Sequence, residues 1–322
     1  LSNPFFIAYP SRLKENRTIM TTFPLKILNN RNMIFLLALI LGFLWDTGAH
    51  YTQRLILPGL AVIMTISSLG ISGDTFRSAK TFIKSSLTGI IGNFFLHGLI
   101  LIGLSMLVIK DQAFWNGFIL LAAVPPAVAV IPFSLFLRGN MELALFGTIG
   151  AYIGGLMITP LVALTFLGTG FISPMKLLLV FGELIIGPLL LSRILIRTGL
   201  LKKIDLYKGP ITNWSFFLII YIITGLNRDI FIQQPLSIVP VALVAILTTF
   251  VLGWAIERAG SLLGFEKSTV TSFELLVTFK NYGLSGALAL VFFNPQTAVP
   301  STVTSAIGIL YFIWLEMRIN KK

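Results

Sequence analysis

The stretch FELLVTFKNYGLSGALALVFF, residues 273–293, decides how this chain is interpreted. It is long enough to cross a lipid bilayer, yet Lys280 and Asn281 interrupt the apolar run near its centre. A lysine at bilayer depth costs about 2.5–3.5 kcal/mol on insertion scales. A chain tolerates that cost only where the ammonium group meets a partner, a cavity or a ligand. We therefore expect Lys280 to mark a functional site inside a membrane.

Composition places most of the chain in lipid. Of the 322 residues, 56% are hydrophobic and 11% are charged, whereas soluble domains average about 25% charged residues. A water-soluble fold could not bury so much apolar surface. The net charge of +12 comes from short loops between apolar runs, which is typical of membrane proteins and argues against a nucleic-acid partner. Cysteine is absent, which excludes disulfides and thiolate metal sites, and no motif for a cofactor is present.

Ten apolar runs predict an all-α membrane protein with ten transmembrane helices. With the N-terminus inside, 19 of the 24 lysine and arginine residues fall on the cytoplasmic side, four fall outside, and Lys280 lies within the bilayer. This asymmetry predicts cytoplasmic termini in an inner or plasma membrane. The polar residues 1–32 are expected to form a cytosolic arm. The predicted segments are residues 33–48, 54–72, 82–109, 113–137, 141–168, 172–198, 212–226, 234–262, 267–293 and 297–319.

The ten segments divide into two sets of five, which predicts two inverted five-helix repeats. An odd number of segments per half forces the halves to insert with opposite orientation, as in many secondary transporters. The fourth segment is interrupted by Pro125-Pro126 and the ninth by residues 278–281, at matching places in the two halves. We expect broken helices 4 and 9 to cross at mid-membrane, where the half-helix N-termini would suit an anion.

The predicted crossing supplies the candidate site residues. A small organic anion is the expected substrate, bound by Lys280, Asn281, Pro125, Pro126, Ala127, Thr278 and Asn93. Ionisable residues inside apolar segments are functional candidates by default. Lys280, Glu183, Glu274 and His97 are therefore candidates for proton coupling.

Structural explanations for the same residues stay open at this stage. His97 could be an ordinary helix–helix contact, and Glu274 could be an exposed carboxylate near the cytoplasmic end. Lys280 could snorkel to a surface or form a structural ion pair with one of the two acids. The glycines of residues 147–155 are predicted to let helices pack closely.

Two regions resemble the bile acid/sodium symporter family. They are AAVPPAVAVIPFSLFLRGNMELALFGTIGAYIGGLMITPL, Ala122–Leu161, and KNYGLSGALALVFFNPQTAVPS, Lys280–Ser301. The resemblance implies ten helices within residues 33–319, with substrate bound in a crevice between a core domain and a panel domain. The core would comprise segments 3–5 and 8–10 (about 82–168 and 234–319), and the panel segments 1, 2, 6 and 7 (about 33–72 and 172–226). Members of this family carry organic anions, often with sodium.

Departures from that family fall on its sodium ligands. Polar side chains that the family places around the crossover are replaced here mostly by side chains without an oxygen atom. The resemblance thus implies transport that is not coupled to sodium in the usual way, with the Lys280 ammonium standing in for the missing cation or exchanging a proton. The substituted positions are Val130, Ile131, Ala144, Leu276, Lys280 and Asn93, while Thr148 keeps its hydroxyl.

Other functions remain compatible with this sequence. A proton-coupled cation antiporter and an auxin-efflux-like carrier would share the crossed broken helices. A membrane receptor and a membrane-embedded enzyme belong to other classes. The sequence shows neither an attached signalling domain nor a hydrolytic motif, which argues against both of them.

Overall fold

The computed structural model describes residues 31–69, 79–127, 129–168, 186–199, 207–233 and 235–320, together with residues 179 and 204. The predicted arm, apart from its last two residues, and Glu183 lie outside the described residues. Within them the named elements are all helices, as the sequence predicted.

The helices follow one another with short connections. The first part of the chain contains α2 (Arg31–Leu44), α3 (Asp46–Thr52), η3 (Gln53–Leu55), α4 (Ile56–Ser68), α5 (Ala79–Ile90), η5 (Ile91–His97), α6 (Gly98–Val108), α7 (Gln112–Ala123), α8 (Val130–Phe136) and α9 (Met141–Leu167). The second part contains α11 (Gly187–Arg197), α13 (Lys208–Leu226), α14 (Arg228–Gln233), α15 (Pro235–Ile246), η8 (Leu247–Val251), α16 (Leu252–Leu262), α17 (Lys267–Thr278), α18 (Tyr282–Phe292), η9 (Pro295–Ala298) and α19 (Val299–Asn320).

Five continuous helices in the described ranges are long and apolar enough to cross a membrane. They are residues 79–108, 141–167, 208–226, 235–262 and 295–318. Residues 33–66 form a sixth candidate, which is bent by 104° at a short break. The chain is therefore an all-helical protein with several candidate membrane spans, while the ten-span count and the inverted repeat remain predictions.

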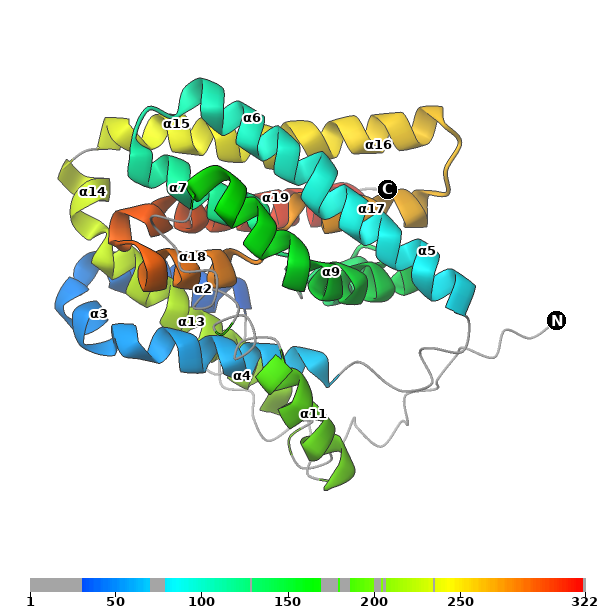
Figure 1. Ribbon diagram of the computed structural model, residues 1–322, viewed down its shortest axis with the longest axis horizontal. Coiled ribbons are helices and arrows are strands. Elements are labelled where there is room, and N and C mark those ends of the chain that lie inside the picture. The colour runs from blue at the N-terminus through cyan, green and yellow to red at the C-terminus, as the bar shows by residue number, and fades with distance from the viewer. Residues whose placement is uncertain are drawn as a thin grey trace.

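The helices pack in two groups (Figure 1). In the first group α13 packs against α2, α3 and α4, and α11 packs against α4. In the second group α5 packs on α9, α16 on α17, α15 on α19, and α7 on α9, α18 and α19. α18 and α19 contact α13, and α18 also contacts α4, so these helices join the two groups. The boundary between the groups therefore runs alongside α18.

Glycine allows α5 and α9 to approach closely. A methyl group added at Gly89 would collide with the backbone of Gly147, and one added at Gly150 would collide with Ser86. Small residues at such contacts let the backbones of two membrane helices come together. This agrees with the packing role predicted for the glycines of residues 147–155.

Candidate functional site

Two broken helices meet in an antiparallel crossing. α7 ends at Ala123 and α17 ends at Thr278, and each chain continues in extended backbone before α8 and α18 begin. Pro126 and Lys280 form an isolated antiparallel bridge at this point. Its hydrogen bonds run from Ala127 N to Phe279 O and from Asn281 N to Pro125 O, both at 2.9 Å. Extended backbone at membrane depth needs such protein partners, so the two breaks stabilise each other.

The side-chain nitrogen of Lys280 lies next to this crossing, against η5 and the end of α7. Lys280 is fully buried, with 0% of the residue exposed. It donates to four oxygens: Asn93 O at 2.9 Å, Asn93 Oδ1 at 2.8 Å, Ala122 O at 2.9 Å and Val124 O at 3.0 Å. It also lies 5.1 Å from the centroid of the Phe94 ring. An ammonium group has three donors, so all of its hydrogen-bonding capacity is used inside the protein.

The oxygens around Lys280 would suit a cation of any kind. Ala122 O and Val124 O belong to the C-terminal end of α7, where the helix dipole is negative. Asn93 lies in the π-helical turn η5, a kind of turn that is frequent at functional sites. Unwound carbonyls and half-helix C-termini are the groups that hold Na⁺ in transporters with broken helices. The Lys280 nitrogen thus occupies a shell of oxygen atoms supplied by η5 and the end of α7.

Side chains of the same π-helical turn, η5, donate hydrogen bonds to carbonyl groups near the C-terminal end of α17. Asn93 Nδ2 donates to Leu276 O at 3.3 Å, and His97 Nδ1 donates to Val277 O. His97 is fully buried, and its Nε2 has no hydrogen-bond partner among the described residues. The side chain of His97 therefore supports the crossing, as a helix–helix contact would.

Asn281 connects the crossing to the other group of helices. Its Oδ1 accepts from Leu284 N at 3.0 Å and so caps the N-terminus of α18. Its Nδ2 donates to the Tyr152 hydroxyl at 2.8 Å and lies 3.9 Å from the sulfur of Met64 on α4. The amide of Asn281 thus faces the boundary between the two groups, beside the positive end of α18.

The remaining predicted substrate-binding residues surround the crossing. Pro125 and Pro126 are buried, Ala127 is partly exposed, and the Thr278 hydroxyl donates to Glu274 O at 2.7 Å. The hydroxyl proton of Thr278 is therefore used in a hydrogen bond within α17, and it is not available to a substrate.

Glu274 does not pair with Lys280. It is 5% exposed and accepts a hydrogen bond from the Tyr311 hydroxyl. This burial excludes the alternative of an exposed carboxylate. The structure describes no acidic partner for Lys280 in the resolved helices, and the environment of Glu183 lies outside the described residues.

Three of the positions predicted to have lost the family's sodium ligands are packed in the apolar core. Val130, Ala144 and Leu276 are fully buried in one hydrophobic cluster with Phe133, Phe279 and Tyr311. Ile131 is partly exposed, and the Thr148 hydroxyl donates to Ala144 O at 2.6 Å, within its own helix. Among these five positions only Thr148 carries a side-chain oxygen, and its hydroxyl is used within α9.

Sequence reasoning missed several partners in this site. The Tyr152 hydroxyl, the Phe94 ring and the Ala122 and Val124 carbonyls were not among the candidate residues. Phe94 had a usable signal, because it follows Asn93 in an interrupted apolar segment. The backbone oxygens had none beyond the Pro125-Pro126 break itself.

Comparisons with known proteins show similarity to a distant relative. The chain matches no protein-family model. It is 22% identical, over 270 residues, to a protein of Bacillus subtilis named "Uncharacterized sodium-dependent transporter YocS". The match covers 83% of this chain and 83% of the relative. The likeness spans most of both chains, and together with the apolar helices it makes the chain a multi-pass membrane protein similar to a transporter.

Proposed function

We propose that this protein is a secondary transporter that moves a small organic anion by alternating access. The observation that carries the proposal is the fully buried Lys280 ammonium, held by four oxygens where two broken helices cross. In this proposal Lys280 is a resident cation. The positive charge of Lys280 would stabilise the oxygen atoms of the crossing, as a bound sodium ion would in a sodium-coupled transporter. Unlike a bound ion, this charge would remain in place throughout the transport cycle.

Matching irregularities in the two halves support the inverted repeat. The helix over residues 79–108 contains the π-helical turn η5, and the helix over residues 235–262 contains the π-helical turn η8. Each is followed by a broken helix, α7–α8 in one half and α17–α18 in the other. In the predicted topology these are the third and fourth segments of each half, with both termini in the cytoplasm of an inner or plasma membrane.

The substrate would bind beside Asn281, at the boundary between the two helix groups. α18 begins there, and the partial positive charge of its N-terminus favours an anion. A positive charge on Lys280, next to the same crossing, would add to the attraction of the anion. Motion of one helix group past the other would then expose the site to each side of the membrane in turn.

The proposed coupling differs from the function in the relative's name. That name describes a sodium-dependent transporter. In this chain, buried apolar side chains occupy positions at which the family it resembles carries sodium ligands, and an amine fills the oxygen shell at the crossing. We therefore expect uptake that does not require sodium.

Reconstituted vesicles test the function and its ion requirement together. Carboxylate and sulfonate anions, from pyruvate to taurocholate, are first screened for an increase in thermal stability of the purified protein. Uptake of the best stabiliser is then measured in sodium and in choline. Equal uptake in the two salts is the expected result. Strict sodium dependence would contradict the resident-cation proposal, and proton flux without any anion would favour the antiporter.

Replacing Asn281 with alanine should reduce uptake by more than its loss of thermal stability explains. The substitution removes an N-cap, which costs about 0.5–2 kcal/mol, and it also removes the amide that faces Tyr152 and Met64. Asn140 provides a matched control, because it caps α9 through Leu143 N at 3.0 Å. We expect both alanine variants to lose similar thermal stability and only Asn281→Ala to lose uptake by more than tenfold. Equal uptake in the two variants would contradict a binding role for Asn281.

A further inference from the structure

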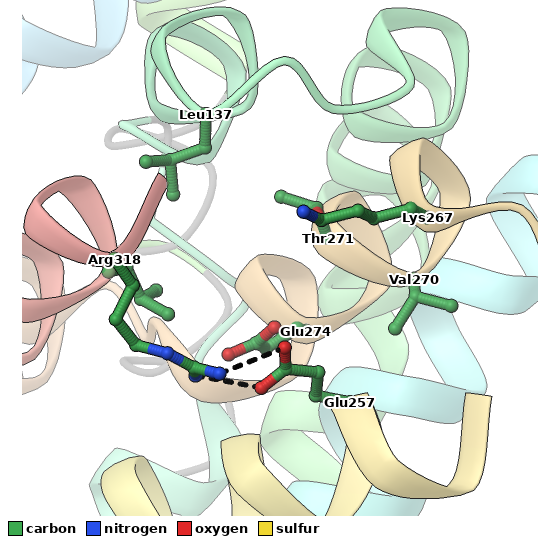
Figure 2. Close-up of a pocket in the computed structure, with 8 residues that line it drawn as sticks. Leu137, Glu257, Lys267, Val270, Thr271, Glu274 and Arg318 are labelled. Carbon is green, nitrogen blue, oxygen red and sulfur yellow. Dashed lines mark hydrogen bonds and ion pairs between the residues drawn. The ribbon is translucent and has the colours of Figure 1, made fainter. Parts of the chain in front are cut away.

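A second polar site lies at one end of the bundle, away from the crossing. It is a pocket between the ends of α8, α16, α17 and α19, and Figure 2 shows its side chains facing a common space. The cavity is small, with a volume of about 50 Å³, which is enough for a few water molecules because one water needs about 10–15 Å³. The lining residues are Leu137, Glu257, Lys267, Val270, Thr271, Glu274, Leu315 and Arg318.

An ion pair forms the water-exposed part of the pocket. Arg318 donates to both carboxylate oxygens of Glu257, at 2.8 and 3.2 Å, and the side chains of both residues are 37% exposed. The guanidinium also lies 4.5 Å from the centroid of the Trp314 ring. Since Glu257 is engaged by Arg318, its charge is already balanced.

Glu274 forms the deeper part of the pocket. Tyr311, which is fully buried, donates its hydroxyl to Glu274 Oε1. No hydrogen bond or ion pair of the described residues engages Oε2. In Figure 2 the Glu274 carboxylate points into the same space as Glu257 and the Arg318 guanidinium. A buried carboxylate with one oxygen held and the other facing a water-accessible pocket is able to take up a proton.

The backbone of α16 makes room for this pair of side chains. A methyl group added at Gly253 would overlap the Tyr311 hydroxyl and would lie 3.1 Å from Glu274 Oε1. Any side chain at this position would therefore displace the hydrogen bond between Tyr311 and Glu274. The absence of a side chain at Gly253 is thus part of how the site is built.

We propose that Glu274 is a proton-binding site that water reaches through this pocket, and that its proton is the coupling ion of the transport cycle. The proposal rests on the function proposed above and names its coupling ion. In the binding step hydronium in the pocket transfers a proton to Oε2. An O–H bond forms on the carboxylate, a water molecule is left behind, and the charge of Glu274 changes from −1 to 0.

The surrounding charges favour a proton over a metal cation. From α16 the pocket receives Glu257, from α19 it receives Arg318, and α17 itself adds Lys267, while α8 adds only Leu137. Among the described residues α5, α9 and η5 contribute no lining side chain. With Glu257 and Arg318 paired to each other, a metal ion beside Glu274 would have a single unpaired carboxylate and would face the Lys267 side chain, whereas a proton needs only that carboxylate.

Tyr311 connects Glu274 to the crossing. Its ring stacks on Phe279, with the centroids 5.9 Å apart, and Phe279 O accepts the hydrogen bond from Ala127 N in the crossing. A hydrogen bond from Tyr311 to an ionised carboxylate is stronger than one to a neutral acid. Protonation of Glu274 would therefore weaken the hydrogen bond from the Tyr311 hydroxyl, which helps to hold the Tyr311 ring against Phe279.

Infrared difference spectroscopy tests proton binding without any substrate. The intact protein in phosphatidylethanolamine–phosphatidylglycerol vesicles is titrated from alkaline to acidic pH, and the carbonyl stretch of newly protonated carboxyl groups is recorded. Glu274→Gln keeps the size and the acceptor oxygen of the side chain, so it is expected to fold. The matched control is Glu142→Gln, which replaces an exposed acid in the first turn of α9.

The expected spectrum loses one buried-acid band in Glu274→Gln and keeps that band in Glu142→Gln. Tyr311→Phe should shift the frequency of the same band, because the ring remains while the hydroxyl donor is lost. Identical bands in the wild type and Glu274→Gln would overturn the proposal. An absence of anion uptake would leave these spectra unchanged, so failure of the proposed function is distinguishable from failure of the proton site.

A second readout tests coupling. With an anion that the wild type transports, an imposed proton gradient should change uptake severalfold in the wild type and in Glu142→Gln. Glu274→Gln should still bind the anion in a thermal-shift assay, while its uptake should no longer respond to the gradient. A response of Glu274→Gln equal to that of the wild type would refute coupling through this residue.

Discussion

Replacing Lys280 with alanine should abolish uptake and lower the stability of the folded protein by several kcal/mol. The substitution leaves Asn93 Oδ1 and the Ala122 and Val124 carbonyls without their charged donor in a buried site. Leaving a buried acceptor without its donor typically costs about 1–3 kcal/mol. Because the Ala122 and Val124 oxygens lie at the end of α7, the loss should also disorder the crossing through which transport is proposed to occur.

Thermal unfolding in detergent and uptake into vesicles measure the two effects separately. Lys84→Ala is the matched control, because Lys84 is an exposed lysine on α5 in the same group of helices. We expect that control to retain the melting temperature and uptake of the wild type. A Lys280→Ala protein that melts like the wild type would show that the ammonium does not support the crossing.

The breaks at the crossing could be predicted from the sequence, because they leave strong local signals. Two consecutive prolines cannot continue α7, and a lysine followed by an asparagine is costly in a membrane segment. The pairing of the breaks with each other followed from their matching positions in the two halves. The sequence predicts interruptions at Pro125-Pro126 and at residues 278–281. In the structure α7 ends at Ala123, before the first of them, while α17 still includes Thr278 and ends there, so the second break is one residue shorter than predicted.

The partners of Lys280 could not be predicted in the same way. Three of its four acceptors are backbone oxygens, and a backbone oxygen has no signature in the side-chain pattern. One of them, Asn93 O, lies in the π-helical turn η5. The composition of residues 91–97 does not distinguish such a turn from an ordinary helix.

Long-range side-chain pairs set a second limit. Glu274 was a candidate for proton coupling, but its neighbours come from α16 and α19, and Tyr311 is 37 residues away in the chain. The rotation of α19 decides whether Tyr311 faces Glu274 or lipid. A helix that is apolar on all sides gives no periodic signal from which to read that rotation.

Glutamine at position 280 should make the stability of the protein sensitive to sodium. The substitution removes the amine but adds a carboxamide oxygen beside Asn93 Oδ1 and the Ala122 and Val124 carbonyls. Oxygen atoms of this kind are suitable ligands for Na⁺ once the resident charge has gone. A cation that binds only the folded state stabilises it by about 2.7 kcal/mol at a concentration 100 times its dissociation constant.

The measurement is a melting curve in sodium chloride and in choline chloride at equal ionic strength. The wild type and Lys84→Gln should melt at the same temperature in the two salts, since neither opens the oxygen shell. Lys280→Gln should melt well below the wild type in choline and recover several degrees as sodium is added. If Lys280→Gln melts equally in both salts, the oxygens around Lys280 do not form a cation site, and the resident-cation account of this protein is wrong.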